Sequence, residues 1–299
     1  MAELFTLQRY LQMPELTERG IRTFDNWAQT FGETIESLEM NPSGVGYRET
    51  TRFAKFANIP ELLTMFRSVA DIKMLQDLPE VQAAMPQNVD RNIAESEPSE
   101  WLKSFVANLN FMAKELKGHK PEPGEPIMLN IVLWGKAAAL DIRLIDPSLP
   151  QLKGGKIDQA IENIYRVYRE TDANKGTQAV FCDISVPKKG GGFTVYKALR
   201  DGLIEKGIPK EEIAFIHDFS KDEDKAKASR MINSGQIRVI IGSTEKLGTG
   251  LNIQERMKAL HHMDARYTPA AIEQREGRMI RQFNTYNDVE VYTYITRES

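Results

Sequence analysis

The chain has 299 residues, of which 39 are Lys or Arg and 42 are Asp or Glu, so its formal net charge is −3; this excludes a wholly basic nucleic-acid coat protein but leaves room for a local basic cleft. An apolar content of 41% is typical of a globular chain, and the single cysteine excludes a disulfide framework and a zinc site built from cysteines. No apolar stretch reaches the roughly 18 residues of a membrane span and the N-terminus lacks the pattern of a secretory signal, so we expect a cytoplasmic location and no membrane partner.

Residues 1–120 are expected to form a mainly helical region, because runs of β-branched residues are few there. Apolar residues recur at helical spacing in several segments, near residues 5–11, 24–31, 60–69 and 101–116. Between them we predict a polar loop at 41–44 and an exposed connector at 79–100, which contains three prolines.

The clearest break in the chain lies at residues 118–126, where three prolines and two glycines disfavour any regular element. Short strands are predicted at 127–133 and 140–145, within a linker over 121–150. A change of pattern then separates this linker from residues 151–299.

Predicted strands and helices alternate over residues 151–299. The strands are short apolar runs, at 178–184, 213–217, 237–241, 260–264 and 289–295. The helices are predicted at 157–168, 195–203, 221–233 and from Thr268 onward, where Thr268 is a favourable N-cap and Pro269 suits the first helical position. This order predicts an α/β fold with right-handed crossovers and a parallel sheet covered by helices on both faces.

The helix that begins after Thr268 carries the strongest functional signal. It is expected to run through Gln282, so that Gln274, Arg278 and Arg281 lie on one face at spacings of four and three residues. Two guanidinium groups on a rigid backbone suit a polyphosphate, because they are permanently charged and bind oxygens in pairs. The alternative is a solvated basic face whose arginines pair with neighbouring glutamates.

A second signal follows the predicted strand at 237–241. Ser243 and Thr244 offer hydroxyl groups at the carboxyl end of that strand, where ligands bind in open α/β sheets. Gly248 and Gly250 would let backbone N–H groups approach a phosphate. The alternative is a glycine-rich turn without a ligand.

These two segments resemble known motifs. GSTEKLGTGLNIQ, followed by a strand that ends at Asp264 and then by QREGRMIRQ, resembles the last two conserved motifs of superfamily-two helicases. The resemblance is closest to Swi/Snf-like translocases of the helicase–methylase type found in bacterial mobile elements and phages. AVFCDIS resembles the strand that opens their second RecA-like lobe. Phe283 departs from the pattern, because relatives often have glycine after RQ.

The resemblance implies a second RecA-like lobe over 151–299, preceded by a helical interlobe region over 1–120 and by the linker. It also implies that an ATP-binding first lobe lies upstream, since the sequence has no G-x-x-x-x-G-K-[ST] loop: Gly154-Gly155-Lys156 lacks the earlier glycine and the following hydroxyl. The chain is thus expected to be the downstream part of an ATP-dependent DNA helicase or translocase, and to be inactive as an ATPase by itself.

Site residues follow from the resemblance position by position. Arg281 is implied to be the arginine finger, Arg278 to bind phosphate or hold the lobe interface, and Gln274 to orient that face. Gly248 and Gly250 would approach the nucleotide, ATP with Mg²⁺, which is held mainly by the absent lobe. The DNA phosphate backbone would be contacted by Ser243, Thr244 and Lys246, and Ser185, Lys188 and Lys189 are further candidates for the same track. The implied partners are DNA, the upstream lobe and a methylase domain.

Two other functions stay open at this point. One is a non-enzymatic nucleic-acid-binding module that keeps the lobe fold, and the other is an α/β enzyme that binds a nucleotide or a methyl donor at the glycine run 190–192. A metal site is not expected, because Cys182 lies in an apolar strand and because His261 and His262 alternate across a strand and cannot face one ion.

Overall fold

The computed structural model describes residues 2–40, 47–116, 126–187, 191–219, 221–248, 251–264 and 268–297. The chain forms two units, Met1–Leu78 and Pro79–Ser299. The predicted boundaries at residues 120 and 150 do not coincide with this division, because the segments on both sides of them belong to the second unit.

Helices predicted from apolar spacing form the core of the first unit. α1 (Ala2–Glu18), α2 (Phe24–Phe31) and α3 (Ile59–Arg67) confirm those predictions. The Trp27 indole of α2 is fully buried, and its Nε1 donates a hydrogen bond to Gln8 Oε1 at 2.7 Å. Phe5 and Met65 belong to the same buried cluster, so all three helices share one core.

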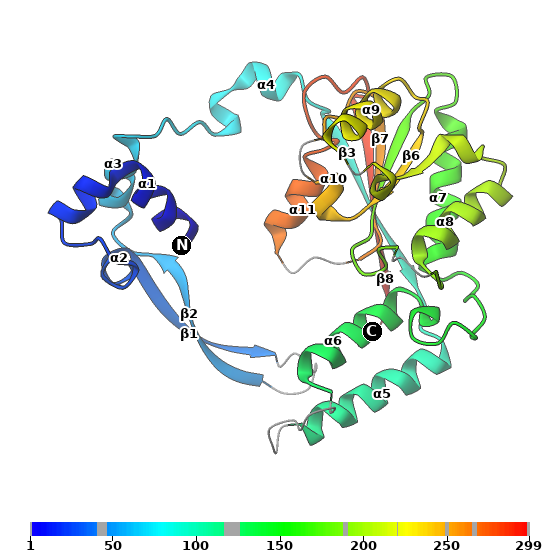
Figure 1. Ribbon diagram of the computed structural model, residues 1–299, viewed down its shortest axis with the longest axis horizontal. Helices are drawn as coiled ribbons and strands as arrows, with labels where there is room; N and C mark the ends of the chain where they lie inside the picture. The colour runs from blue at the N-terminus through cyan, green and yellow to red at the C-terminus, as the bar shows by residue number, and fades with distance from the viewer. Residues whose placement is uncertain are drawn as a thin grey trace. The chain divides into compact units, whose positions relative to one another are not determined.

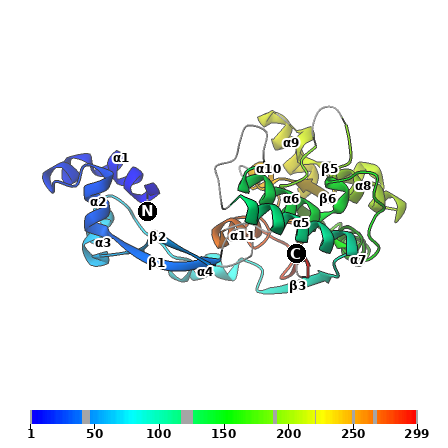
Figure 2. The ribbon, with the colours of Figure 1, turned by 90° about the horizontal axis from the view of Figure 1, so that it is seen from below.

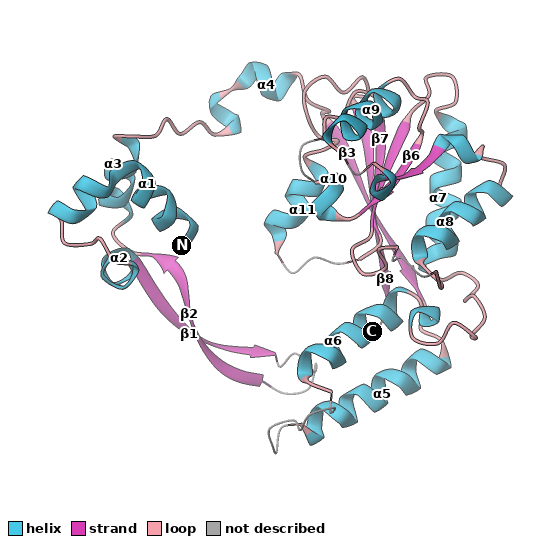
Figure 3. Ribbon diagram, in the orientation of Figure 1, coloured by secondary structure: helices cyan, strands magenta, loops and turns pink. Residues whose placement is uncertain are grey.

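An antiparallel hairpin that sequence analysis did not predict completes the first unit. β1 (Gly32–Met40) pairs with β2 (Tyr47–Phe56) along its whole length. Figures 2 and 3 show the two strands as a long ribbon that continues from α2. Both strands are rich in charged and hydroxyl residues, and Leu38 and Phe53 are exposed. Cross-strand pairing stabilises such strands, so hydrophobic patterning does not reveal them. The polar loop predicted at 41–44 lies outside the described residues.

The second unit contains a six-stranded, parallel sheet in the order β3-β8-β7-β4-β6-β5. All strands predicted after residue 151 are confirmed, as β4 (Thr177–Phe181), β5 (Ile213–Phe215), β6 (Val239–Gly242), β7 (Met257–His262) and β8 (Asp288–Thr296). The chain order reverses around β4, because β5 and β6 lie on one side of it and β7 and β8 on the other. Ligands bind at the carboxyl ends of strands where such a reversal occurs.

Helices cover both faces of this sheet (Figure 1), which confirms the predicted α/β fold. α7 (Lys156–Glu170) and α8 (Val195–Glu205) pack on one face. The elements on the other face are α9 (Asp222–Asn233), α10 (Thr244–Leu247) and α11 (Pro269–Glu276). Val180 of β4 belongs to the first cluster, and its neighbours Ala179 and Phe181 belong to the second. Burial on both faces explains why β4 is a continuous apolar run.

The prediction of an exposed connector over 79–100 is wrong. This segment contains the short helix α4 (Pro79–Ala83) and the strand β3 (Asn88–Ser96), which pairs in parallel with β8. β3 is an edge strand, and most of its side chains are exposed or half-buried. Its polar sequence suits that position, because an edge strand has one neighbour and covers little apolar surface.

The strands predicted at 127–133 and 140–145 are also wrong. Met128–Leu140 form the helix α6, and Ile142–Leu144 form a single 3-10 turn. α6 packs through Ile131 on α5 (Glu100–Glu115), a predicted helix that is confirmed. A short apolar run suits a buried helix as well as a strand, and here the packing on α5 decides between them. Within the described ranges, none of the helices combines the length and the apolar character that a transmembrane segment needs.

His261 of β7 is fully buried in the α7 face of the sheet. Its Nδ1 accepts the Tyr294 hydroxyl at 2.9 Å, and its Nε2 donates to Gln178 Oε1 at 3.0 Å, because the Gln178 amide nitrogen itself donates to Ile164 O. Burial is the largest of the causes that lower the pKa of His261 to about 3, and the electrostatic effects of His262 and Arg166 act in the same direction. His262 faces the opposite cluster, against Phe181.

We expect His261 to make stability depend on pH. An unfolded chain binds a proton at this imidazole near its ordinary pKa of 6.5, whereas the folded chain resists protonation down to about 3. Between these values the unfolded state therefore binds more protons, and stability falls as the pH falls. Urea unfolding measures the loss of unfolding free energy between about pH 7 and about pH 5. This loss should be smaller by roughly 2 kcal/mol in His261→Gln than in the unchanged protein. Equal slopes for the variant and the unchanged protein would show that this histidine does not titrate on unfolding.

Candidate functional site

A cavity of about 600 Å³ lies at the carboxyl ends of β4, β5 and β6, and we name it the strand-end cavity. Its walls are residues that follow these strands and one residue of α11, namely Asp183, Val186, His217, Ser243, Thr244, Glu245, Lys246 and Gln274. Four predicted site residues, Ser243, Thr244, Lys246 and Gln274, thus line one cavity. The opening arises at the reversal of chain order, because the connections that follow β4 and β6 leave the sheet on opposite faces.

Two carboxylates join the ends of three strands beside this cavity. Asp183, after β4, accepts the Thr244 N–H through Oδ1 at 2.6 Å and the Thr244 hydroxyl through Oδ2 at 2.8 Å. Asp264, after β7, accepts the backbone N–H groups of Asp183 and Ile184. The loop after β6 is therefore tied to the end of β4, and the end of β4 is tied to the end of β7.

Arg275 of α11 lies fully buried at the centre of these contacts. Its guanidinium donates to Asp183 Oδ2 at 2.9 Å, to Asp264 Oδ1 at 2.8 Å and to Thr244 Oγ1 at 2.7 Å. Its Nη1 also donates to the Asp264 backbone oxygen at 3.1 Å and lies 3.2 Å from His262 Nδ1, an acceptor in this geometry. A buried charge is tolerated here because two carboxylates pair with it and its donors are engaged.

Sequence analysis did not identify Arg275, Asp183 or Asp264 as site residues. A signal was present, because Asp183 lies at the end of one predicted strand and Asp264 at the end of another. The carboxyl ends of parallel strands meet at one edge of a sheet, so two carboxylates there that are partly or fully removed from water favour a cation between them. Arg275 supplies it from the predicted helix, one position beyond Gln274.

The helix predicted through Gln282 ends earlier than expected. α11 stops at Glu276, and Gly277 donates its N–H to Glu273 O as the C-cap. Residues 277–281, which we name the arginine turn, continue as turns, in which Arg278 N bonds to Arg275 O and Arg281 N to Met279 O. Gln274, Arg278 and Arg281 therefore do not share one helix face, because glycine favours a helix end and the buried side chains of Arg275 and Glu276 fix that end in place.

Arg278 and Arg281 differ in their surroundings. Arg278 is half-buried and donates to two backbone oxygens, those of Gly248 and, at 3.1 Å, Leu251. Burial lowers the pKa of Arg278, and the charge of Arg281 lowers it further, so the two groups lie near each other. Arg281 is exposed and donates to Asn252 Oδ1 at 3.2 Å.

Gly248 has a structural reason to be glycine. Its N–H donates to Thr244 O at 2.7 Å, and a Cβ added to it would lie 2.2 Å from that same backbone oxygen. Its own carbonyl oxygen accepts a hydrogen bond from Arg278. The described contacts thus place Gly248 in the support of the loop, and Gly250 lies outside the described residues.

The residues predicted to contact the DNA backbone differ in their exposure to solvent. Lys246 is exposed at the strand-end cavity, whereas Ser243 is buried and caps α10 by accepting the Lys246 N–H. Ser185 is 5% exposed, and its hydroxyl accepts the Val195 N–H at the start of α8. That internal bond leaves Ser185 no surface for a strand of DNA in this structure. Lys188 and Lys189 lie outside the described residues.

Glu276 anchors α11 to the edge of the sheet. Its Oε1 lies 2.7 Å from Arg91 Nη1 of β3 and 3.6 Å from His262 Nε2. Burial acts to raise the pKa of this carboxyl, but the contacts with His262 and Arg91 outweigh burial and lower the pKa to about 2. Elsewhere in the cavity wall, burial and the charge of Lys246 lower the pKa of His217.

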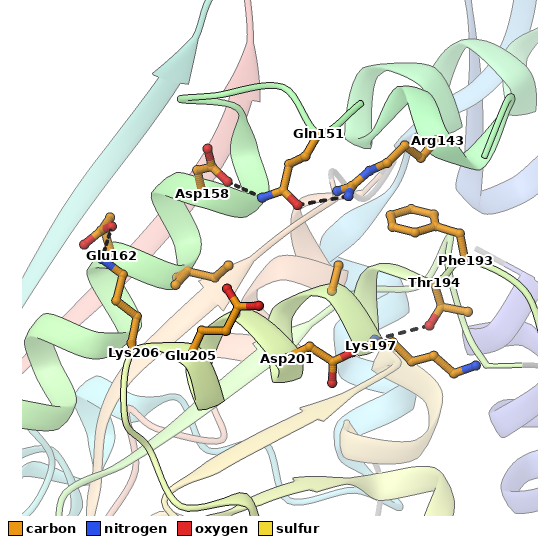
Figure 4. A pocket seen from close by; sticks show the side chains of 13 residues that line it. Arg143, Gln151, Asp158, Glu162, Phe193, Thr194, Lys197, Asp201, Glu205 and Lys206 are labelled. Carbon is orange, nitrogen blue, oxygen red and sulfur yellow. Dashed lines mark hydrogen bonds and ion pairs between the residues drawn. The ribbon is translucent and has the colours of Figure 1, made fainter. Parts of the chain in front are cut away.

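A larger cavity, of about 850 Å³, lies between α7 and α8 (Figure 4). Phe193 and Thr194, which follow the glycine run at 190–192, form one side of it. Figure 4 shows Gln151 between Arg143 and Asp158, with hydrogen bonds to both, and Arg143 lies over the Phe193 ring. The walls carry four carboxylates, those of Asp158, Glu162, Asp201 and Glu205, and three cations, Arg143, Lys197 and Lys206. Lys206 pairs with Glu162, so the cavity has no excess of positive charge that would favour a phosphate group.

Comparison with known proteins finds one family model that is similar to part of the chain. Residues 160–282 match the family described as helicase conserved C-terminal domain, which confirms the resemblance found in the two motifs. The match spans the strands β4 to β7, the strand-end cavity and the arginine turn, and it leaves out β3 and β8. No curated protein matches the chain in sequence.

The solved structures that the chain matches include two ATPase domains and one helicase. The C-terminal part of the Fun30 ATPase domain is 13% identical, with a TM-score of 0.45 over 72% of this chain and 87% of that one. The Sulfolobus solfataricus SWI2/SNF2 ATPase C-terminal domain is 18% identical, with a TM-score of 0.46 over 71% of this chain and 80% of that one. The DUF1998 helicase MrfA, solved bound to DNA, is 16% identical, with a TM-score of 0.33 over 47% of this chain and 18% of that one.

Gly248→Ala should destabilise the chain, because the new methyl group meets a backbone oxygen that cannot move without breaking α10. We expect a loss of about 2 kcal/mol in unfolding free energy, measured by urea unfolding. Gly135→Ala in α6 is the matched control, since its Cβ would only make ordinary contact, 3.5 Å from Leu109 Cδ1. Similar stabilities for the two variants would contradict the close contact at Gly248.

Proposed function

We propose that this chain, whose residues 160–282 match the helicase conserved C-terminal domain, is the C-terminal part of an ATP-dependent DNA helicase or translocase. Its contribution is an arginine finger and part of the track that holds the DNA backbone. ATP with Mg²⁺ is held mainly by an upstream lobe of the same parent protein. The observation that carries the proposal is the exposed Arg281 guanidinium, on a turn that Arg278 fixes to the backbone oxygens of Gly248 and Leu251.

Arg281 is the side chain best suited to reach a nucleotide on another lobe. It is exposed, and its hydrogen bond to Asn252 is made at the surface. Arg278 is committed to the carbonyl oxygens of the loop after α10, so its role is to hold the arginine turn against that loop. A permanently charged fork on such a support stabilises the charge that develops on a transferred phosphoryl group.

The charged side chains of this region fit the part of a nucleotide site that supplies cations, and not the part that binds the metal ion. Among the residues that the structure describes, no group of three or more His, Cys, Asp and Glu side chains could hold a metal ion. Asp183 and Asp264 are the carboxylates nearest the strand ends, and both are paired with Arg275. Mg²⁺ would therefore be held by the partner lobe, as would most of the nucleotide.

The strand-end cavity supplies the proposed contact with DNA. Lys246 is an exposed cation there, and Gln274 offers an amide from the facing helix. Ser243 and Thr244 hold the backbone beneath Lys246 through the α10 cap and through Asp183. A lysine binds phosphate without distinguishing bases, which suits a protein that moves along DNA. The methylase partner, the mobile-element setting and the cytoplasmic location stay predictions.

We expect the chain to bind DNA with an affinity that falls as salt concentration rises. Lys246→Ala should weaken binding and reduce the slope of log affinity against log salt by about one, because one phosphate contact is lost. The measurement is fluorescence anisotropy with a labelled duplex over a series of salt concentrations. Lys210→Ala is the matched control, since Lys210 is exposed near the start of β5, at the amino edge of the sheet. Equal effects of the two substitutions on DNA binding would show that Lys246 does not contact the DNA backbone.

Arg281→Ala should abolish ATP hydrolysis in a protein that contains this chain together with its ATP-binding lobe. We expect hydrolysis to fall by about a thousandfold or more, while ATP affinity changes little, because the finger acts on transition-state charge. Steady-state hydrolysis and nucleotide titration measure the two effects. Arg230→Ala, which removes an exposed arginine of α9, is the control. Hydrolysis at the unchanged rate would show that Arg281 is not the finger, and DNA binding without any effect of nucleotide would favour a non-enzymatic binding module.

A further inference from the structure

We propose that Arg275 is a positioning residue that joins the loop after β6 and the arginine turn into one unit. The inference rests on the proposed function, in which the loop supplies Lys246 and the turn supplies Arg281. Arg275 touches neither DNA nor nucleotide in this proposal, because its side chain is fully buried. It acts by fixing the distance between the two groups that do.

A closed ring of contacts carries the proposal. Arg275 Nε donates to Thr244 Oγ1 at 2.7 Å, and one turn of α10 connects Thr244 to Gly248, whose N–H donates to Thr244 O. The Gly248 carbonyl oxygen accepts from the Arg278 guanidinium. Arg278 returns to the start, because its backbone N–H donates to Arg275 O at 3.1 Å. The loop and the turn therefore share two connections, one at each end of α10.

The ring is attached to the sheet at several points. Asp183 and Asp264 hold the Arg275 guanidinium at the ends of β4 and β7. Glu276, the next residue, is held by Arg91 of β3 and faces His262. A displacement of the loop by a bound strand would thus be passed to the arginine turn, and a displacement of the turn by nucleotide would be passed to the loop.

The planar fork of arginine is required for this role. Arg275 binds Thr244 through Nε, Asp183 and Asp264 through Nη2, and the Asp264 backbone oxygen through Nη1. A lysine keeps the charge that the two carboxylates need, but its single ammonium group cannot reach all of these acceptors at once. Arg275→Lys is therefore expected to keep the fold and to open the ring at Thr244.

Arg238 is a matched control that has the burial of Arg275 without its connections. It is also fully buried, and it donates to Gly176 O, Tyr168 O, Thr171 Oγ1 and Asp172 Oδ1. It directly precedes β6, so its contacts lie at the amino edge of the sheet. Arg238→Lys should therefore lower stability as Arg275→Lys does, without reaching the strand-end cavity or the arginine turn.

Amide hydrogen exchange of the full chain tests the coupling directly. In Arg275→Lys, amides of residues 243–248 and 277–281 should exchange about tenfold faster, both segments by a similar factor, while residues 178–181 and 239–241 keep their protection. Arg238→Lys should leave both of the first two segments unchanged. Acceleration of only one segment, of neither segment, or of the whole sheet alike would overturn the proposal.

Thr244→Val is the second variant, and it decides the question if Arg275→Lys does not fold. It removes the acceptor of Arg275 Nε while leaving Arg275 paired with Asp183 and Asp264. The same coupled exchange of residues 243–248 and 277–281 is expected. Unchanged exchange in this variant would overturn the proposal.

DNA binding separates a failure of this inference from a failure of the proposed function. Where the unchanged chain binds DNA in a salt-dependent manner, Arg275→Lys should weaken binding about fivefold or more and Arg238→Lys about twofold or less. Equal affinities of the two variants would overturn the positioning role. Absence of DNA binding by the unchanged chain would refute the proposed track, and the exchange experiment would still decide whether Arg275 couples the two segments.

Discussion

The Arg275 guanidinium lies buried between Asp183 and Asp264, and the geometry of the carboxyl edge depends on this contact. Neither carboxylate could be buried alone, because removal from water is costly for an unpaired charge, and the same holds for the arginine. The ion pairs of Arg275 with Asp183 and Asp264 attach the ends of β4 and β7 to α11. The hydrogen bond from Arg275 to Thr244 attaches the end of β6 to the same helix. Three strands and α11 are thereby held in one arrangement, on which the strand-end cavity is built.

Within residues 274–281, some side chains hold the backbone in place and others are exposed. Gln274 is exposed to the cavity, Arg275 and Glu276 are buried in ion pairs, and Arg278 grips backbone oxygens of the adjoining loop. Arg281 is then presented at the surface on a backbone that these contacts hold. This arrangement suits the proposed role of Arg281, in which its guanidinium meets the charge that develops on a nucleotide held by another lobe. A guanidinium that is already in position stabilises a transition state best, because it does not have to move during the reaction.

Contacts from outside the family match extend this support. Residues 160–282 match the helicase conserved C-terminal domain, yet Arg91, which pairs with Glu276 of α11, lies in β3 at the edge of the sheet. β3 belongs to a segment that, by its polar composition, suggested a connector. The edge strand β3 thus contacts the helix that precedes the arginine turn through the carboxylate of Glu276. Contacts with His262 and Arg91 hold the pKa of this carboxylate at about 2 despite its burial.

The sequence by itself predicted five strands of the parallel sheet and the resemblance to helicase motifs, because buried strands such as 178–184 and motifs such as QREGRMIRQ consist of contiguous residues. It also predicted Ser243, Thr244 and Lys246 at the carboxyl end of one strand, where ligands bind in open α/β sheets. The structure adds Gln274 of α11 to the same cavity. Only the tertiary structure decided the hairpin β1–β2, the edge strand β3 and the helix α6, whose states depend on a neighbour that is distant in sequence. The same reason applies to Arg275: its two carboxylates are 92 and 11 positions away, so no local pattern shows that this arginine is the buried one.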